Sequence, residues 1–189
     1  MVKIWLIRHG ATAGNLEKRY IGRTDEALCP RGIVQTGQLA ARSRKPDRLF
    51  ASPMLRTRQT AEYAFPGMAY RTDERLREMD FGLFEGKTAA ELEHDSQYRD
   101  WLESNCEAPV PGGESVADFK ERCCQAFLEL LDEIPAGDTA AFVVHGGTIM
   151  AVMERFGPAK SFYRWHLGNC GVLCCEWDPV KQCLRPETD

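Results

Sequence analysis

Two short apolar runs in this chain each end in a histidine followed by glycine. Arg8-His9-Gly10 closes the run that begins at Val2, and His145-Gly146-Gly147 follows the run over residues 139–144. Arg56 stands early in a predicted helix that follows a third apolar run. Two guanidinium groups and two imidazoles gathered in one place would bind an anion such as phosphate strongly.

Other routes to phosphate chemistry lack their sequence signatures. The chain has no His-x-His or His-Glu-x-x-His spacing for a metal site and no Gly-x-x-x-x-Gly-Lys-Ser/Thr loop for a nucleotide. None of its eight cysteines is followed six positions later by arginine, as a cysteine-dependent phosphatase loop would require. Histidine is left as the candidate nucleophile, and the chemistry is expected to need no metal.

The elements that must position these residues alternate between strands and helices. Continuous apolar runs predict buried strands over Val2–Ile7, Arg48–Ala51 and Thr139–Val144. Helical periodicity predicts helices over residues 30–42, 53–64, 115–131 and 148–156. This alternation indicates an α/β layered fold, in which ligands bind beyond the carboxyl ends of the parallel strands. The two histidines and both arginines would then share one crevice.

Local signals mark where the helices begin. Ser52-Pro53 is typical of an N-cap followed by proline in the first helical position. Ser115 with Asp118 resembles a capping box at the start of the longest expected helix. Apolar or small residues on neighbouring turns of the helix over 30–42 are Ile33, Val34, Gly37 and Ala40. The apolar face expected after Ser115 consists of Val116, Phe119, Cys123, Phe127 and Leu130.

Composition limits the class of protein. A length of 189 residues fits one domain, and a net charge of −4 with scattered basic residues argues against a nucleic-acid partner. No apolar run approaches membrane-spanning length, so a cytoplasmic location and no membrane partner are expected. The eight cysteines are expected to be reduced thiols that act as small apolar residues. A redox or metal-binding protein is the alternative, and it would need exposed, clustered thiols.

Five segments between Leu6 and Thr148 carry a family resemblance. In order they are LIRHGATAGN, ASPMLRTRQTA, REMDFGLFEG, PGGES and VVHGGT. They resemble the histidine phosphatase superfamily, in its phosphoglycerate-mutase-like branch. The resemblance implies an α/β three-layer sandwich whose central, mostly parallel sheet is flanked by helices. It also implies one domain over residues 1–189 with a small helical cap at about 87–111, metal-independent phosphatase activity and no cofactor.

The resemblance also assigns roles to residues. It implies a covalent phosphohistidine on His9 and a proton donor at Glu78. Positions that match those holding the phosphoryl group are Arg8, Asn15, Arg56 and His145. Gly22 and Gly146 are expected to complete the substrate site. The neighbouring arginines should lower the pKa of His9 and keep its attacking nitrogen neutral.

Several assignments have competitors. Arg58 competes with Arg56, because only one of the two can face the site well. Asn15 could be only a turn former. Alternatives to Glu78 in the same loop are Asp80 and Glu85. His94 and His166 have no motif around them and are expected to be surface or ordinary half-buried residues.

The substrate is expected to be a small phosphate monoester. The short length, REMDFGLFEG and WHLGNCGV look most similar to the bacterial α-ribazole phosphatases of cobalamin biosynthesis. Phe84, Tyr98 and Trp101 could stack on an aromatic leaving group such as a benzimidazole nucleoside, or could only pack the cap onto the domain.

Three other functions stay open. Phosphoglycerate mutase is the first alternative, and this chain differs from it in two places. Mutases carry paired arginines after the acid-bearing loop, whereas residues 87–111 contain only Arg99. Ile21 stands where the mutase loop typically has a hydroxyl residue before Gly22. A broad-specificity phosphatase acting on sugar or nucleotide phosphates is the second alternative. A non-catalytic phosphate-binding domain is the third, and it would not need Glu78. The oligomeric state does not follow from the sequence.

Overall fold

The computed structural model describes residues 1–187, which form one six-stranded sheet in the order β3-β2-β4-β1-β5-β6. The strands are β1 (Val2–Arg8), β2 (Arg48–Ala51), β3 (Arg71–Thr72), β4 (Thr139–Val144), β5 (Val172–Asp178) and β6 (Cys183–Pro186). β3, β2, β4 and β1 are parallel, and β5 is antiparallel to β1. The expected mostly parallel sheet is confirmed, and so are the three strands predicted from the apolar runs.

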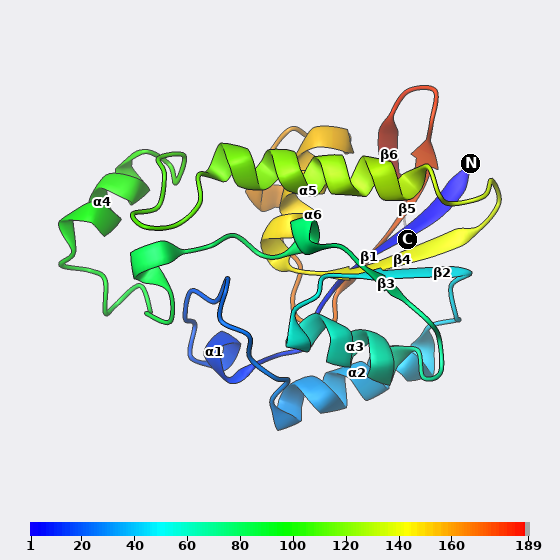
Figure 1. Cartoon of the computed structure of the whole chain (residues 1–189), viewed down its shortest axis with the longest axis horizontal. Coiled ribbons are helices and arrows are strands. Elements are labelled where there is room, and N and C mark those ends of the chain that lie inside the picture. The colour runs from blue at the N-terminus through cyan, green and yellow to red at the C-terminus, as the bar shows by residue number, and fades with distance from the viewer. Residues whose placement is uncertain (188–189) are drawn as a thin grey trace.

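Helices cover both faces of this sheet, as Figure 1 shows. They are α1 (Ala13–Leu16), α2 (Pro30–Arg42), α3 (Leu55–Ala64), α4 (Ser96–Glu103), α5 (Val116–Leu131) and α6 (Gly146–Phe156). Short 3-10 turns cover Glu74–Leu76, Gly82–Phe84 and Tyr163–Trp165. α5 and α6 lie on one face, and α2 and α3 lie on the other, which confirms the three layers.

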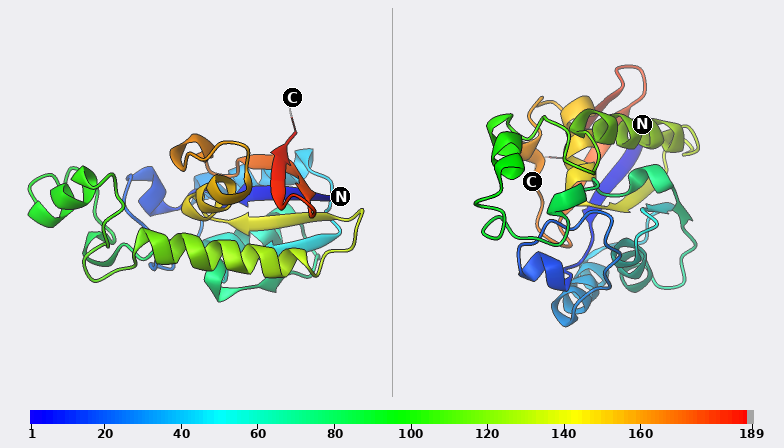
Figure 2. Two further views of the ribbon diagram at one scale, coloured as in Figure 1. Left: turned by 90° about the horizontal axis from the view of Figure 1, so that it is seen from above. Right: turned by 60° about the vertical axis from the view of Figure 1, so that its left-hand side comes forward.

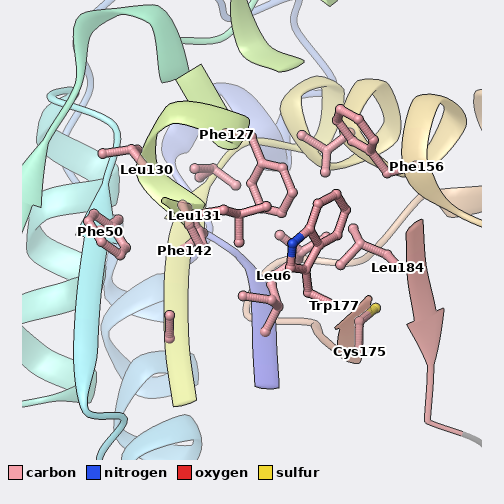
Figure 3. Packing of buried hydrophobic residues seen from close by; sticks show 14 of the residues in the cluster. Leu6, Phe50, Phe127, Leu130, Leu131, Phe142, Phe156, Cys175, Trp177 and Leu184 are labelled. Atoms are coloured by element: carbon pink, nitrogen blue, oxygen red, sulfur yellow. The ribbon is translucent and has the colours of Figure 1, made fainter. Parts of the chain in front are cut away.

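The two central strands are buried on both faces. In β4, Phe142 faces the side of α5 and α6, whereas Val143 faces the side of α2 and α3. This alternation explains the continuous apolar runs, because each face of the strand packs against helices. Figure 3 shows the larger cluster, in which the Phe127 ring lies 5.0 Å from Phe142 and 6.2 Å from Trp177 between ring centroids.

The predicted bounds and apolar faces of α2 and α5 can be compared with the structure. α2 has the predicted bounds, but its buried residues are Gly32, Thr36 and Leu39, while Ile33 and Val34 are exposed. The predicted apolar face of α2 is therefore wrong by about one residue around the helix. α5 begins as predicted, because the Ser115 side chain accepts a hydrogen bond from the Asp118 N–H, and its predicted apolar face is buried.

The segment over residues 87–111 contains one helix, α4, and lies beyond the sheet edge where β1 and β4 end (Figures 1 and 2). Its buried side chains join Met79, Phe84 and the first turns of α5 in a separate apolar cluster. This cluster includes Tyr98 and Trp101 of α4. The segment is thus packed against the loop over residues 79–84 and the first turns of α5.

Cys123, Cys124, Cys170 and Cys175 are buried in the apolar clusters. Burial raises the pKa of Cys170 to about 11 and that of Cys175 to about 12. These four thiols are therefore packed as small apolar residues, as predicted. Among residues 1–187, every helix is too short or too polar to cross a membrane.

Candidate active site

The pairing of β1 with β4 brings the two histidines together. Arg8 is opposite Val144 in the parallel register, so the next residues, His9 and His145, leave the sheet side by side. The His9 N–H donates to the Val144 carbonyl at 3.0 Å, and the two imidazole centroids are 5.3 Å apart. The predicted meeting of both strand ends in one place is what the structure shows.

The His9 ring is held in a defined protonation state. Its Nδ1 lies 2.7 Å from the Gly10 carbonyl oxygen, which only accepts, so Nδ1 carries a hydrogen. Burial is the largest cause that holds the pKa of His9 well below its ordinary value, and the charges of Arg56 and Arg8 act in the same direction. The neutral ring then has its lone pair on Nε2.

Ser52 contacts the second imidazole, a role that the sequence did not reveal. Its Oγ lies 2.7 Å from His145 Nε2, and both side chains are fully buried. The expected N-cap at Ser52 is wrong, because α3 begins at Leu55 with Met54 as its N-cap. Ser52 directly follows β2, its N–H donates to the Val143 carbonyl of β4, and its hydroxyl lies beside His145. α6 likewise begins at Gly146, two residues before the predicted start.

Arg56 projects from the first turn of α3 into the interior and is only 1% exposed. Its two terminal nitrogens donate to the carbonyl oxygens of Thr24, at 2.8 Å, and Gly22, at 2.9 Å. Arg58 is exposed on the opposite side of the helix. Of the two competing arginines, Arg56 is therefore the one that the fold turns toward His9.

Gly22 lies behind Arg56 rather than on the cavity wall formed by the described residues. Its N–H donates to Glu85 Oε1 at 2.8 Å, and its carbonyl receives the Arg56 hydrogen bond. A Cβ at this position would come within 1.8 Å of the Met79 oxygen. The expectation that Gly22 contacts the substrate is not supported by this geometry, because both of its backbone groups hold the loop that supports Arg56.

Glu78 faces the candidate site from the loop between the 3-10 turns Glu74–Leu76 and Gly82–Phe84. Its Oε2 accepts the Gly147 N–H at 3.0 Å, at the N-terminus of α6, and its Oε1 accepts the Met79 N–H at 3.1 Å. The competing carboxylates are engaged elsewhere. Asp80 accepts the Gly82 N–H, and Glu85 accepts the N–H groups of Gly22, Thr24 and Phe81.

The backbone of the Glu78 loop is held by Arg122 of α5, which sequence reasoning missed. Arg122 donates to the carbonyls of Arg75, Arg77 and Glu78 at 2.7, 2.8 and 3.1 Å. The Glu114 carboxylate in turn binds the guanidinium through two nitrogens, at 2.6 and 2.8 Å. Such a two-point pair fixes the orientation of a guanidinium group, and through it the loop that carries Glu78.

The chain before β5 completes the site. Arg8 Nη1 donates to the Leu167 carbonyl at 2.6 Å and lies 3.3 Å from His166 Nε2. Asn169 Nδ2 donates to the His9 carbonyl and to Asn15 Oδ1, both at 3.1 Å. His166 is exposed, as predicted, but it lies on the wall of the candidate site. The signal that could have found these contacts was the WHLGNCGV segment.

A cavity of about 330 Å³ opens in front of His9. Predicted site residues on its wall are Arg8, His9, Asn15, Glu78 and Gly146. Aromatic residues on its wall are Tyr20, Phe81, Trp101, Phe162 and Tyr163. Phe84 and Tyr98 are buried behind this wall, so the packing alternative holds for them, whereas Trp101 both packs and lines the cavity.

Four buried side-chain nitrogens in the described part of the chain have no hydrogen-bond partner. They are Arg8 Nε, Arg56 Nε, His145 Nδ1 and Trp101 Nε1. Buried polar atoms are normally paired, so unpaired ones require an explanation. Three of the four belong to residues that the resemblance places around a phosphoryl group. No group of three or more His, Cys, Asp or Glu side chains within residues 1–187 is arranged to hold a metal ion.

A model of the histidine phosphatase superfamily (branch 1) matches residues 4–185. The chain belongs to this superfamily. It is therefore an enzyme of the metal-independent phosphatase and mutase type. The predicted family is confirmed.

Individual relatives of this histidine phosphatase differ in activity. Probable phosphoglycerate mutase GpmB of Salmonella paratyphi C is 31% identical over 181 residues, which cover 91% of this chain and 83% of that protein. A phosphoserine phosphatase of Entamoeba histolytica, solved with 3-phosphoglyceric acid, is 30% identical with a TM-score of 0.81, and the match covers 94% and 91% of the two chains. The α-ribazole phosphatase of Shigella flexneri has a TM-score of 0.87 at 24% identity, covering 98% and 94%, and shares the fold.

Proposed function

We propose that this histidine phosphatase hydrolyses a phosphate monoester through a phosphohistidine on His9. The observation that carries the proposal is the set of unpaired buried nitrogens on Arg8, Arg56 and His145. Arg8 ends β1, Arg56 lies in α3 and His145 is the N-cap of α6, and the three groups lie around the His9 imidazole, whose charge is suppressed. A tetrahedral anion bound to His9 would give such donors the oxygen partners that the protein does not supply.

In the first step, the His9 Nε2 lone pair attacks phosphorus and the ester P–O bond breaks. The Gly10 carbonyl keeps the hydrogen on Nδ1, so the ring presents its lone pair on the other nitrogen. Charge on the transferred group is spread over its equatorial oxygens, and fixed cationic donors stabilise it there. Arg8 and Arg56 supply those charges, and the amide of Asn15 supplies a neutral donor on the cavity wall.

Glu78 is assigned the proton transfers. The leaving alkoxide needs a proton as the ester bond breaks, and a protonated Glu78 on the cavity wall can donate it. The resulting carboxylate then takes a proton from the water that attacks the phosphohistidine. This second step releases inorganic phosphate and restores both His9 and Glu78, so no external cofactor is consumed.

For the leaving group we propose a benzimidazole nucleoside, which makes α-ribazole 5′-phosphate the substrate. The aromatic rings on the cavity wall support this choice, because flat rings bind heteroaromatic bases by stacking. The basic side chains on the same wall, beyond Arg8 and His166, are already paired. Arg19 binds Glu17 and Glu91, and Lys120 binds Glu107 and Glu154. A small carboxylate such as that of glycerate would have to compete with these pairs.

Phosphoglycerate mutase activity is the second candidate, because relatives at 31% identity carry that name. A broad-specificity phosphatase is the third. The discriminating measurement is kcat/KM for hydrolysis of α-ribazole 5′-phosphate, 3-phosphoglycerate, ribose 5-phosphate and AMP. With 3-phosphoglycerate, formation of the isomerised mutase product is measured as well. We expect α-ribazole 5′-phosphate to rank first, in the presence or absence of EDTA. Mutase turnover of phosphoglycerate with little hydrolysis would reject the assignment.

The nucleophile is tested separately by His9→Ala. This variant should lose activity on every substrate, and no substrate should label it as an acid-labile phosphoenzyme. Full activity of His9→Ala, or loss of wild-type activity with EDTA, would reject the mechanism whatever the leaving group.

A further inference from the structure

Asn169 is fixed beside the candidate nucleophile by the backbone around it. The Cys170 N–H donates to the Arg8 carbonyl at 3.0 Å, and the Arg8 N–H donates to the Gly171 carbonyl at 3.0 Å. The Leu167 carbonyl receives the Arg8 side chain. The segment over residues 167–171 is therefore clasped against the end of β1, with the Asn169 side chain turned to His9 and Asn15.

The orientation of the Asn15 amide follows from its partners. Its side-chain oxygen receives the Thr12 N–H at 3.2 Å, and a backbone N–H can only donate, so this atom must be Oδ1. Asn169 reaches the same oxygen at 3.1 Å and therefore does so with its NH2 group. Two donors thus occupy Asn15 Oδ1, and the Asn15 NH2 group is left for the cavity that Asn15 lines.

We propose that Asn169 is a positioning residue that keeps the donor end of Asn15 directed at the phosphoryl group and the His9 backbone in place. The inference rests on the proposed function, because it requires a phosphoryl group at His9. An Asn15 amide turned around would present its oxygen to phosphoryl oxygens and repel them. Asn169 opposes that rotation from one side while the Thr12 N–H opposes it from the other.

Two variants remove the donor in different ways. Asn169→Leu keeps the approximate volume without polar atoms, and Asn169→Asp keeps the shape but leaves only acceptors at neutral pH. We expect both to weaken binding of inorganic phosphate, measured by calorimetry, about 3- to 10-fold, the range for one hydrogen bond. KM should rise with it, while kcat falls less. Asn105→Asp, on the same cavity wall but with no hydrogen bond to Asn15, controls for the added charge and should lose much less affinity.

A double-mutant cycle with Asn15→Ala separates positioning from general destabilisation. The loss of phosphate affinity caused by Asn169→Leu should shrink at least twofold when Asn15 is already alanine. An equal loss in both backgrounds, or wild-type affinity in Asn169→Asp, would overturn the inference. Wild-type hydrolysis of phosphate monoesters, and its loss in His9→Ala, decides the proposed function itself. If the wild type hydrolyses its substrate but the cycle shows no coupling, the proposed function stands and the role of Asn169 falls; if the wild type hydrolyses none of the substrates, both fall.

Discussion

Arg56 shows how burial makes a single side chain suitable for this chemistry. The guanidinium is almost fully covered, and burial lowers its pKa, although the charge of Glu78 opposes this shift. Two backbone carbonyls hold its terminal nitrogens, and its Nε is unpaired. A charge held this rigidly at low dielectric interacts more strongly with a transferred phosphoryl group than a mobile surface arginine would.

Replacing Arg56 by alanine should therefore cost much more activity than replacing Arg58. We expect Arg56→Ala to lose about 1.5 to 3 kcal/mol of transition-state stabilisation, the scale of one charge-assisted hydrogen bond. Arg58→Ala, which removes an exposed guanidinium from the same helix, is the matched control. Values of kcat/KM for both variants check this, with melting temperatures to detect unfolding. The reverse ranking would mean that α3 presents its other face to the substrate.

Glu78→Gln should separate proton donation from binding. The amide keeps the size of the side chain but cannot supply the proton, so turnover of an alkyl phosphate should fall by roughly 10² to 10⁴. An activated aryl phosphate, whose leaving group needs no proton, should lose less at the phosphorylation step. Burst kinetics on both substrates measure the two losses. Equal losses would remove Glu78 from the acid role and direct attention to Asp80.

Site residues that follow an apolar run could be predicted from the sequence, whereas the residues that support them could not. Arg8, His9 and His145 follow apolar runs, and the parallel register alone brings them together. Ser52, Arg122 and Asn169 act through contacts that join distant segments, with sequence separations of 93, 44 and 160 residues. A local pattern does not specify the distant partner of such a contact, even where a segment such as WHLGNCGV contains one end of it, and a capping pattern at Ser52 pointed to the wrong partner.

Among the secondary-structure elements, the N-terminus of α6 fixes the position of Glu78, the proposed proton donor. The first amide groups of a helix are unpaired within it and favour negative charge. Gly147 offers its N–H to Glu78, and the lack of a side chain lets the carboxylate approach. A Cβ at residue 147 would lie 2.2 Å from Glu78 Oε1, so this close approach requires glycine.

Gly147→Ala should thus displace Glu78 without removing it. Turnover of alkyl phosphates is expected to fall about 10-fold or more, with a smaller loss on activated aryl phosphates. Gly37→Ala on α2 is the control, because a Cβ there meets nothing within 4 Å. That variant should gain about 0.5 to 1 kcal/mol of stability from helix propensity and keep wild-type activity. Wild-type turnover in Gly147→Ala would show that the carboxylate does not work from this position.

Helix bounds were predicted well only where the local signals were clear. α2 and α5 begin and end where the sequence indicated, because proline, a serine cap and the loss of periodicity are local signals, whereas α3 and α6 each begin two residues from the predicted start. The buried face of α2 was misjudged because Thr36 is buried, with its hydroxyl bonded to the Ile33 carbonyl, while Ile33 and Val34 face outward. A buried threonine satisfied by its own helix looks like a surface residue in the sequence.

For the whole molecule, two buried neutral imidazoles make stability depend on pH. Burial is the largest cause that lowers the pKa of both His9 and His145 well below the ordinary value, and the charge of Arg56 adds to it. In the unfolded chain both would titrate near pH ~6.5. Below that pH, the unfolded state binds more protons than the folded state until the folded pKa is reached, so stability decreases as the pH falls.

His145→Gln should reduce this dependence. Removing one of the two buried imidazoles should lower the slope of unfolding free energy against pH, on the acid side of pH ~6.5, by up to about 1.4 kcal/mol per pH unit. Urea titrations of both proteins between pH 5 and 8 measure the difference, while above pH ~7 the two curves should run parallel. Parallel curves over the whole range would mean that His145 takes up a proton equally in the folded and unfolded states, which contradicts a lowered pKa.

Under the proposed function, the three unpaired nitrogens around His9 would also link the lifetime of the protein to the product of its reaction. Inorganic phosphate would satisfy them only in the folded state, so each increase in its concentration shifts the folding equilibrium toward the native form. The same anion competes with substrate for the same atoms. Where phosphate accumulates, we expect the enzyme to be inhibited and at the same time protected from unfolding and proteolysis. A variant selected to escape product inhibition would lose that protection, because both effects arise from the same donors.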